Sequence, residues 1–347
     1  MIENELLEVS GLEVIYEVGK AKVRAINKID FSLSKGETLG IVGESGAGKS
    51  AVALAIMRLL PEANARILAG SILFNGKDLL QLSMPEMRKT RGEKIAMIFQ
   101  DPMTALNPVM PVGDQIYEIL RYHNVSGMPK WQLEARVDEV LELVGIPAFR
   151  KKEYPFQFSG GMRQRVVIAV AVACQPELLI ADEPTTSLDV TIQAQVLAMI
   201  RQLRDKLDTS MILITHNLGI VAQMCDKVAI MYSGEIVEYG PIEKVFEGDI
   251  HHPYTIGLFN SLPKLNDNAD RLTPIDGFMP DPTELPAGCK FSARCTRSSD
   301  VCVRTPPKPD AFSSDGHRIA CHLYAQEFRT VSETPGVLSG PPLKGGA

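Results

Sequence analysis

The stretch GESGAGKS at residues 43–50 combines residue types and a spacing that could bind a chain of phosphates. It fits the pattern G-x-x-x-x-G-K-[ST], follows the apolar run TLGIV and leads into the helix-like run AVALAIMRLL. Glycines let the backbone curl so that successive amide groups point at one phosphate chain, and the helix N-terminus adds the positive end of its dipole. Lys49 would bridge the β- and γ-phosphates, and the Ser50 hydroxyl would bind Mg²⁺. The candidate residues of this loop are Gly43, Glu44, Ser45, Gly46, Ala47, Gly48, Lys49, Ser50 and Ala51.

Two adjacent carboxylates, Asp182 and Glu183, form a second candidate element. They follow four apolar residues in ELLIADEP, which places both at the end of a buried strand. Asp182 would lie in the outer coordination sphere of Mg²⁺, and Glu183 would polarise the attacking water as a general base. A solvated acidic turn is the alternative interpretation.

A third element, FSGGMRQR at residues 158–165, predicts a second anion site. Its Ser-Gly-Gly begins the helix-like run MRQRVVIAVAVA, so Ser159, Gly160 and Gly161 would expose amide groups at a helix N-terminus. One nucleotide does not need two phosphate cradles in one chain. We therefore expect the second cradle to serve a nucleotide held by another chain, which implies a dimer.

The composition limits the other classes of function. The 347 residues are 45% hydrophobic and 22% charged, with a net charge of −6, which disfavours nucleic-acid binding because such proteins usually carry a basic face. The longest apolar run, residues 166–174, is shorter than the ~18 residues of a spanning helix, and no basic segment precedes an apolar run at the start. We expect a chain that is neither secreted nor membrane-spanning.

The hydrophobic pattern predicts an α/β fold. Residues 6–16 and 23–33 alternate apolar and polar side chains, as antiparallel half-buried strands do. From Thr38 onward, short apolar runs alternate with longer helical stretches, which indicates a mainly parallel core sheet. Residues 112–123 and 130–144 read as an inserted pair of helices, and residues 227–240 read as a hairpin.

These patterns suggest three domains. A nucleotide-binding domain would span residues 1–260, with its helical insertion at about 101–175. A Pro- and Asp-rich module with four cysteines would follow at 261–331, and a Gly/Pro-rich tail at 332–347 reads as disordered.

Taken in order, the motifs resemble those of an ATP-binding-cassette (ABC) ATPase over about residues 6–260. The resemblance adds Gln100 in FQD as the Q-loop, SLD at 187–189 as the D-loop and His216 as the switch histidine. It implies that Tyr16 stacks on adenine, that Gln100 binds Mg²⁺ and couples the site to the helical insertion, and that His216 contacts the γ-phosphate. By the same resemblance, Ser159 and Gly161 would contact the γ-phosphate of the ATP in the facing chain.

Two of these positions have alternative interpretations. Tyr16 could be a packing residue and His216 a structural histidine. The signature departs from the usual Leu-Ser-Gly-Gly-Gln, since Met162 replaces an amide side chain and cannot make its hydrogen bonds.

Four cysteines near the end of the chain, Cys289, Cys295, Cys302 and Cys321, raise the question of a metal site. Five, six and eighteen residues separate them, whereas zinc sites favour pairs two to four residues apart. Disulfides are disfavoured in a reducing cytosol. Cys₄ ligation suits an iron-sulfur cluster, which would cross-link a module of low apolar content. From spacing alone, zinc and unliganded thiols remain alternatives.

The sequence around these cysteines is similar to the C-terminal extension of ATPase subunits of dipeptide and oligopeptide ABC importers. Residues 251–265 and 275–295, with DPMTALNP and ADEPTTSLDVTIQAQV, carry this resemblance. It implies a [4Fe-4S] cluster on the four cysteines. His317 and His322 are possible substitute ligands, although we favour the interpretation that they are surface histidines.

The combined resemblance implies an ATP- and Mg²⁺-dependent subunit on the cytoplasmic face of the membrane. Its partners would be a paralogous ATPase or a second copy, two membrane permeases and, indirectly, an extracytoplasmic substrate-binding protein, with no nucleic acid. Related importers carry nickel, glutathione or oligosaccharides. A soluble ABC ATPase of DNA repair or translation, and a redox-regulated binding module, are the rival classes.

Overall fold

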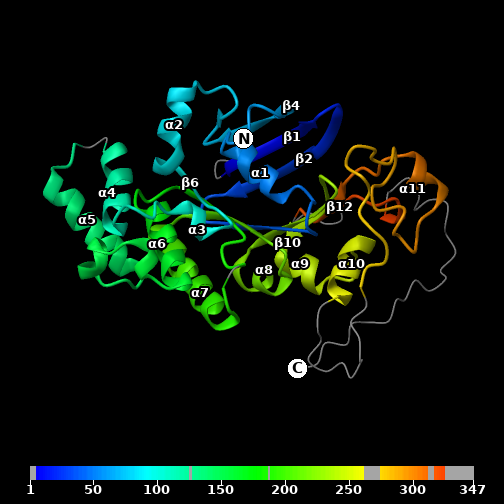
Figure 1. Cartoon of the computed structure of the whole chain (residues 1–347). Helices are drawn as coiled ribbons and strands as arrows, with labels where there is room; N and C mark the ends of the chain where they lie inside the picture. Colours follow the sequence, from blue (N-terminus) through cyan, green and yellow to red (C-terminus); the bar gives the residue numbers. More distant parts are fainter. Residues whose placement is uncertain (1–4, 125–126, 187, 262–273, 312–315, 325–347) are drawn as a thin grey trace.

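A sheet of mainly parallel strands forms the centre of the molecule, which we describe from a computed structural model (Figure 1). The structure describes residues 5–124, 127–186, 188–261, 274–311 and 316–324. The strand order of this sheet is β11-β12-β10-β9-β3-β8-β7-β6, and β9, β3, β8, β7 and β6 pair in parallel. Its strands are β3 (Thr38–Val42), β6 (Ile95–Ile98), β7 (Leu178–Asp182), β8 (Ser210–Thr215), β9 (Lys227–Tyr232), β10 (Glu235–Pro241), β11 (Asp310–Ala311) and β12 (Arg318–Ile319).

An antiparallel sheet of order β2-β1-β4-β5 lies over one side of the central sheet. It contains β1 (Glu5–Val18), β2 (Ala21–Ser34), β4 (Ala65–Phe74) and β5 (Lys77–Asp78). The inward side chains of β1, β2 and β4 pack with α1 (Lys49–Ile56) and the central strands in one buried apolar cluster. The period-two pattern of the sequence thus corresponds to one buried face per strand.

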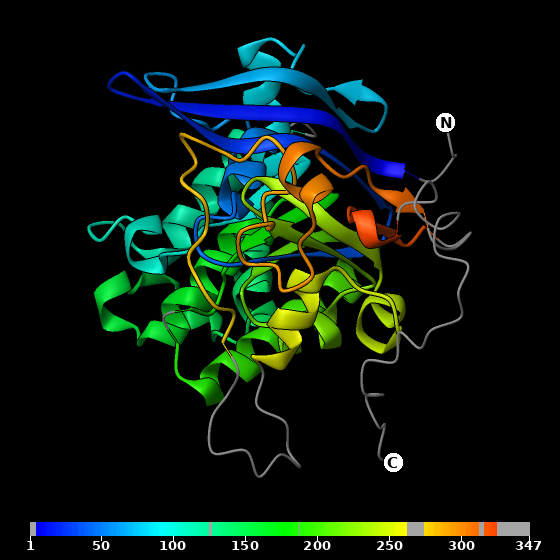
Figure 2. The same cartoon turned by 90° about the vertical axis from the view of Figure 1, so that its right-hand side faces the viewer.

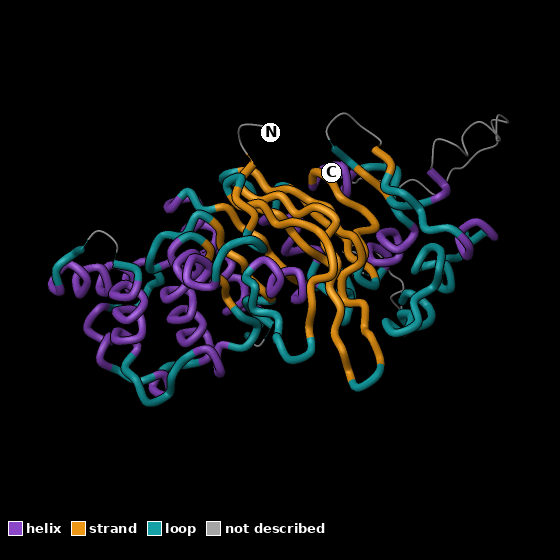
Figure 3. Tube along the Cα trace, turned by 90° about the horizontal axis from the view of Figure 1, so that it is seen from above, coloured by secondary structure: helices purple, strands orange, loops and turns teal. Residues whose placement is uncertain are grey.

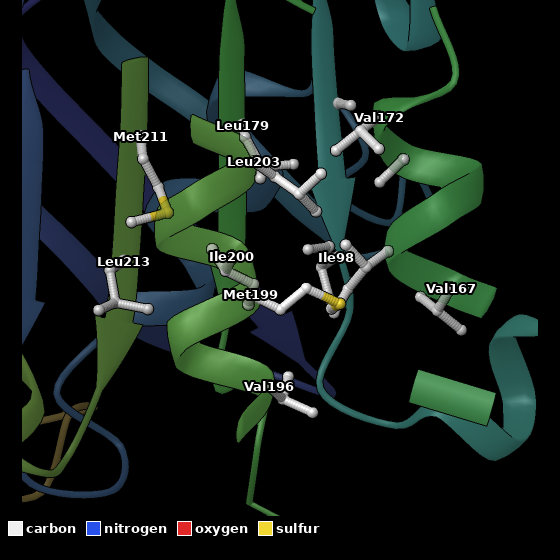
Figure 4. Close-up of a cluster of buried hydrophobic side chains, with 14 of the residues drawn as sticks. Ile98, Val167, Val172, Leu179, Val196, Met199, Ile200, Leu203, Met211 and Leu213 are labelled. Atoms are coloured by element: carbon white, nitrogen blue, oxygen red, sulfur yellow. The ribbon is translucent and has the colours of Figure 1, made fainter. Parts of the chain in front are cut away.

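The opposite face of the central sheet carries a second apolar cluster. Successive residues of each strand point to opposite faces, so Leu178 and Ile180 join the first cluster and Leu179 joins the second. Figure 4 shows Met199, Ile200 and Leu203 of α7 (Val190–Leu207) facing the strand residues Leu179, Met211 and Leu213. Continuous apolar runs are needed because these strands are covered on both sides.

A helical region stands at one end of the molecule, beyond β6 and β7 (Figures 1 and 3). It contains α3 (Pro102–Ala105), α4 (Val112–Tyr122), α5 (Lys130–Leu143) and α6 (Gly160–Val172). The predicted amphipathic face of α5 is confirmed, since Leu133, Val137, Val140 and Leu141 are buried. The remaining helices are α2 (Met84–Glu93), α8 (Leu218–Met224), α9 (Ile242–Glu247), α10 (Pro253–Asn260) and α11 (Asp300–Arg304), with short 3₁₀ turns at Ala148–Lys152, Pro155–Gln157 and His322–Tyr324.

At the other end, the loop-rich C-terminal segment lies against the strands and α10 (Figure 2). We call residues 274–311 and 316–324 the C-terminal module. Its strand β12 pairs with β10, and the Arg24 amide donates to the Pro282 carbonyl at 3.0 Å. The predicted tail at 332–347 lies outside the described residues. In the described part of the chain, no helix is long and apolar enough to cross a membrane.

A buried carboxylate anchors this module. Glu238 of β10 is 1% exposed, and its Oε1 lies 3.0 Å from His251 Nδ1 and 3.1 Å from His317 Nε2. Its Oε2 accepts from the His252 amide. His317 is 6% exposed, so its assignment as a surface histidine is wrong: the C-terminal module folds back and supplies a partner that Glu238 needs in order to be buried.

We expect Glu238→Gln to destabilise the protein and to reduce the loss of stability in acid. Burial alone would raise the pKa of Glu238, but hydrogen bonds from His251 and His317 lower it from 4.5 to about 2. Because the folded pKa is depressed, the contribution is complete above the unfolded pKa and is lost as the pH falls through about 2. The full shift corresponds to roughly 3 kcal/mol.

Urea unfolding at neutral pH and at about pH 3 measures this effect. Glu284→Gln, at an exposed carboxylate of the same module, is the control. An acid loss of stability as large in Glu238→Gln as in the wild type would contradict the anchor.

Candidate functional site

The phosphate loop joins β3 to α1 and has the tight curl that its glycines predict. Gly48 precedes α1 with φ +99°, and a Cβ built there would lie 2.3 Å from the Ala25 carbonyl oxygen. Lys49 is buried at 7% exposure, and its Nζ donates to the carbonyls of Gly43 at 2.8 Å and Glu44 at 2.9 Å. Burial lowers the pKa of Lys49, although Glu183, Asp182 and Glu44 oppose this shift. The backbone carbonyls of the loop therefore hold the Lys49 ammonium group in place.

Asp182 lies beside this loop at the end of β7. It is 5% exposed, and burial raises its pKa, against which a hydrogen bond from Ser50 acts. Its Oδ1 is buried with no hydrogen-bond partner among the described residues. A buried carboxylate oxygen with a free lone pair next to a serine hydroxyl fits Mg²⁺ and its water ligands, which prefer oxygen donors.

Glu183 is the point at which three separate segments meet. Its Oε2 accepts from Gln100 Nε2 at 3.1 Å and from Thr186 Oγ1 at 2.8 Å. Its Oε1 lies 3.4 Å from His216 Nδ1. Burial would raise the pKa of Glu183, but the bonds from Thr186 and His216 prevail and lower it. The carboxylate is therefore ionised at neutral pH, which is the state a general base requires.

Backbone geometry fixes where Glu183 points. Its φ is +46°, in the left-handed region, and its amide donates to the Ile214 carbonyl at 2.9 Å. The same β8 strand ends one residue before His216, whose side chain is 61% exposed. The sequence analysis did not predict that Thr186 donates to Glu183, although a hydroxyl three residues after the carboxylate is close enough in the chain to do so.

The signature segment begins α6 as predicted. Ser159 is the N-cap, its Oγ accepts from the Met162 amide at 3.4 Å, and Ser159 and Gly160 are exposed. A Cβ at Gly161 would lie 2.5 Å from Ile192 Cγ2, so this glycine permits close contact with α7. Met162 stands where the usual signature has glutamine. Its sulfur accepts a hydrogen bond from Arg150 Nη1 at 3.4 Å.

The remaining predicted residues lie as follows. Tyr16 is half-buried in β1, paired with Val23 and Ala65, and burial raises its pKa. In the predicted D-loop, Asp189 caps α7 by accepting from the Ile192 amide at 3.0 Å. Ser187 lies outside the described residues.

The predicted iron-sulfur cluster is wrong. All four C-terminal cysteines are free thiols that line one small hollow beside Phe291. Within the described ranges, no group of three or more His, Cys, Asp or Glu side chains is arranged to hold a metal ion. Burial raises the pKa of Cys289 to about 11 and of Cys321 to about 12, so the thiolate that a metal requires is disfavoured.

The geometry can be compared with known families. A model described as ABC transporter matches residues 26–186, and one described as the oligopeptide/dipeptide transporter C-terminal region matches residues 237–302. The chain is 50% identical to the dipeptide transport ATP-binding protein DppD of Bacillus subtilis, over 93% of this chain and 96% of the relative.

This chain belongs to the ABC transporter family. It is 48% identical to the oligopeptide transport ATP-binding protein OppD of Salmonella typhimurium, over 94% of this chain and 96% of the relative. None of these descriptions names an iron-sulfur protein, in agreement with the correction above.

Solved structures support the same fold. The ABC cassette MJ0796 superposes with a TM-score of 0.61 at 23% identity, over 68% of this chain and 98% of the cassette. CbiO1 of Clostridium perfringens gives a TM-score of 0.61 at 28% identity, over 71% of this chain and 92% of CbiO1. The predicted ABC-type α/β fold is confirmed, and as an ABC ATPase the chain binds and hydrolyses ATP.

Gly48→Ala tests the curl of the phosphate loop. We expect it to destabilise the protein by more than about 3 kcal/mol, since a left-handed residue costs about 1–2 kcal/mol and a backbone clash adds to it. Gly76→Ala is the matched control, because Gly76 also has positive φ but nothing within 4 Å of a built Cβ. Equal losses of stability in urea unfolding would show that the close contact with Ala25 has no effect.

Proposed function

We propose that this chain is the ATPase subunit of a peptide importer. We also propose that the cluster of Glu183, Gln100 and His216 is its hydrolytic centre. The contacts of Glu183 with Gln100 Nε2 and His216 Nδ1 carry the proposal, because they join β6, β7 and β8 at one carboxylate. The sequence matches to DppD and OppD support the peptide class of transport.

ATP binds to the loop of residues 43–51 in this proposal. Backbone amides and Lys49 hold the β- and γ-phosphates, and Tyr16 stacks on adenine. Ser50 and Gln100 would hold Mg²⁺, and Asp182 would accept hydrogen bonds from its water. The metal would supply charge neutralisation on the phosphates, and the chain positions the residues that would hold it.

Hydrolysis follows from the state of Glu183. Its ionised carboxylate accepts a proton from water as that water attacks the γ-phosphate, the bond from the γ-phosphorus to the bridging oxygen breaks, and ADP leaves. Thr186 and His216 hold the carboxylate in place, and His216, which is well exposed, reaches the γ-phosphate. Gln100 reports the state of this site to the helical region, because it lies in the short connection between β6 and α3.

The exposed start of α6 serves a second chain. Ser159, Gly160 and Gly161 present a helix N-terminus that contacts the γ-phosphate of an ATP held by a facing cassette. The partner is a paralogous ATPase, with a second copy of this chain as the alternative. Two ATP molecules close the pair, and their hydrolysis reopens it.

The chain works on the cytoplasmic face of the membrane, where the helical region contacts two permease subunits. An extracytoplasmic binding protein delivers the substrate. Dipeptides or oligopeptides are the cargo we favour over nickel, glutathione and oligosaccharides, because both similar relatives are peptide transport proteins by name.

Glu183→Gln tests the hydrolytic centre. We expect ATP turnover to fall on the order of 100-fold or more while ATP still binds, because glutamine has nearly the same size and shape as glutamate but cannot take a proton. Glu139→Gln, at a residue of α5 whose side chain is 59% exposed, is the control and keeps full turnover. Turnover within a few-fold of wild type in Glu183→Gln would remove Glu183 from the mechanism.

Uptake of labelled dipeptides and oligopeptides tests the transport role. In cells that lack the gene, wild-type chain restores uptake, whereas Glu183→Gln does not, since closed cassettes cannot reopen. Uptake of nickel, glutathione or oligosaccharide restored in place of peptide uptake would contradict the peptide assignment.

A further inference from the structure

A salt bridge joins the C-terminal module to the phosphate loop. Arg294 Nη1 lies 3.1 Å from both carboxylate oxygens of Glu44, the second residue of the loop. The Arg294 side chain is 6% exposed and that of Glu44 is 32% exposed. A cation 250 positions further along the chain is thus largely withdrawn from water next to the phosphate cradle.

Arg294 is fixed by contacts of its own module. Its Nε donates to the Asp276 carbonyl at 2.9 Å and its Nη2 to the Ile275 carbonyl at 3.1 Å. The guanidinium also lies 5.8 Å from the ring centroid of Tyr232 and 5.9 Å from that of Phe291. Since two of these partners are backbone groups, the cation is in place before any nucleotide arrives.

Glu44 is the link between this cation and Lys49. Its amide donates to Tyr254 Oη at 3.0 Å, and its carbonyl accepts from Lys49 Nζ at 2.9 Å. Tyr254 is fully buried and packs edge-on against Tyr232. One loop residue is therefore held by α10 through its backbone and by the C-terminal module through its side chain.

The negative charge of Glu44 would weaken ATP binding if it were not neutralised by Arg294. A carboxylate in the loop repels a triphosphate and competes with it for Lys49, since it attracts that cation across the loop. Pairing with a buried guanidinium cancels most of this repulsion. Nothing else described in the loop carries a negative charge, because the other residues of 43–51 are glycine, serine, alanine and Lys49.

We propose that Arg294 is a positioning residue for ATP binding, which neutralises and holds Glu44 so that the docked C-terminal module sets the affinity of the phosphate loop for ATP. The inference rests on the ATP site proposed above. In this proposal the C-terminal module contributes to the nucleotide site through Arg294, and its cysteines take no part.

The test compares the ATP affinity and turnover of the wild type with those of three full-length variants. Arg294→Gln raises the Kd and KM for Mg-ATP on the order of tenfold, because it frees the Glu44 carboxylate, while kcat stays within about twofold. Glu44→Gln alone binds ATP at least as well as wild type. Arg294→Gln combined with Glu44→Gln returns the affinity to within about threefold of wild type, since the unpaired charge is gone.

Rescue by the second substitution separates charge pairing from mere structural support. If Arg294 only supports the fold, the double variant binds ATP as weakly as Arg294→Gln or more weakly, and the proposal falls. Arg304→Ala removes a surface pair within the same module and is the matched control, expected to bind ATP normally. Thermal unfolding of each variant checks that it is folded.

Lys49→Ala tests the proposed ATP site separately from the role of Arg294. Lost ATP binding in this variant supports the site itself, so that an unaltered Kd in Arg294→Gln then overturns the role of Arg294 alone. Undiminished ATP binding in Lys49→Ala overturns the proposed ATP site and this inference with it.

Discussion

The parallel pairing of β3, β8 and β7 is the constraint on which the site depends. In this register Val42 lies opposite Thr215, and Asp182 lies opposite Ile214. Each of these strands ends beside an element of the proposed site: the loop of residues 43–51 follows β3, His216 follows β8 and Glu183 follows β7. Parallel strands bring their carboxyl ends to one edge, where ligands of open α/β sheets bind. A single hydrogen-bonded register therefore assembles groups more than 130 positions apart.

Burial makes this register unambiguous. The strands β3, β7 and β8 are buried along their whole length, with alternate residues in the two apolar clusters. A slip of one residue would send each side chain to the wrong cluster and would move Asp182 away from Ser50. The stability of the core and the geometry of the site are thus the same requirement.

The C-terminal module extends this dependence beyond the cassette. It is attached by β12, by the partners of Glu238 and by Arg294, which reaches the phosphate loop. Each attachment places a charge or a backbone edge against an element of the ATPase core. Phe291 of the module joins the larger apolar cluster of the core. Docking of the module also places the Arg294 guanidinium beside Glu44 of the phosphate loop.

The sequence by itself determined the fold class and the groups at the strand ends. Gly43–Ser50 and the Asp182–Glu183 pair were readable because local spacing dictates their geometry: a loop before a helix, and a carboxylate after a buried strand. The helices 112–122 and 130–143 followed from apolar periodicity for the same reason. Tertiary structure alone decided that Arg294 pairs with Glu44 and that His317 is buried on Glu238, since residues 250 and 79 positions apart leave no local pattern. It also decided the state of Cys289 and Cys321, because the spacing of thiols does not report the burial that raises their pKa values.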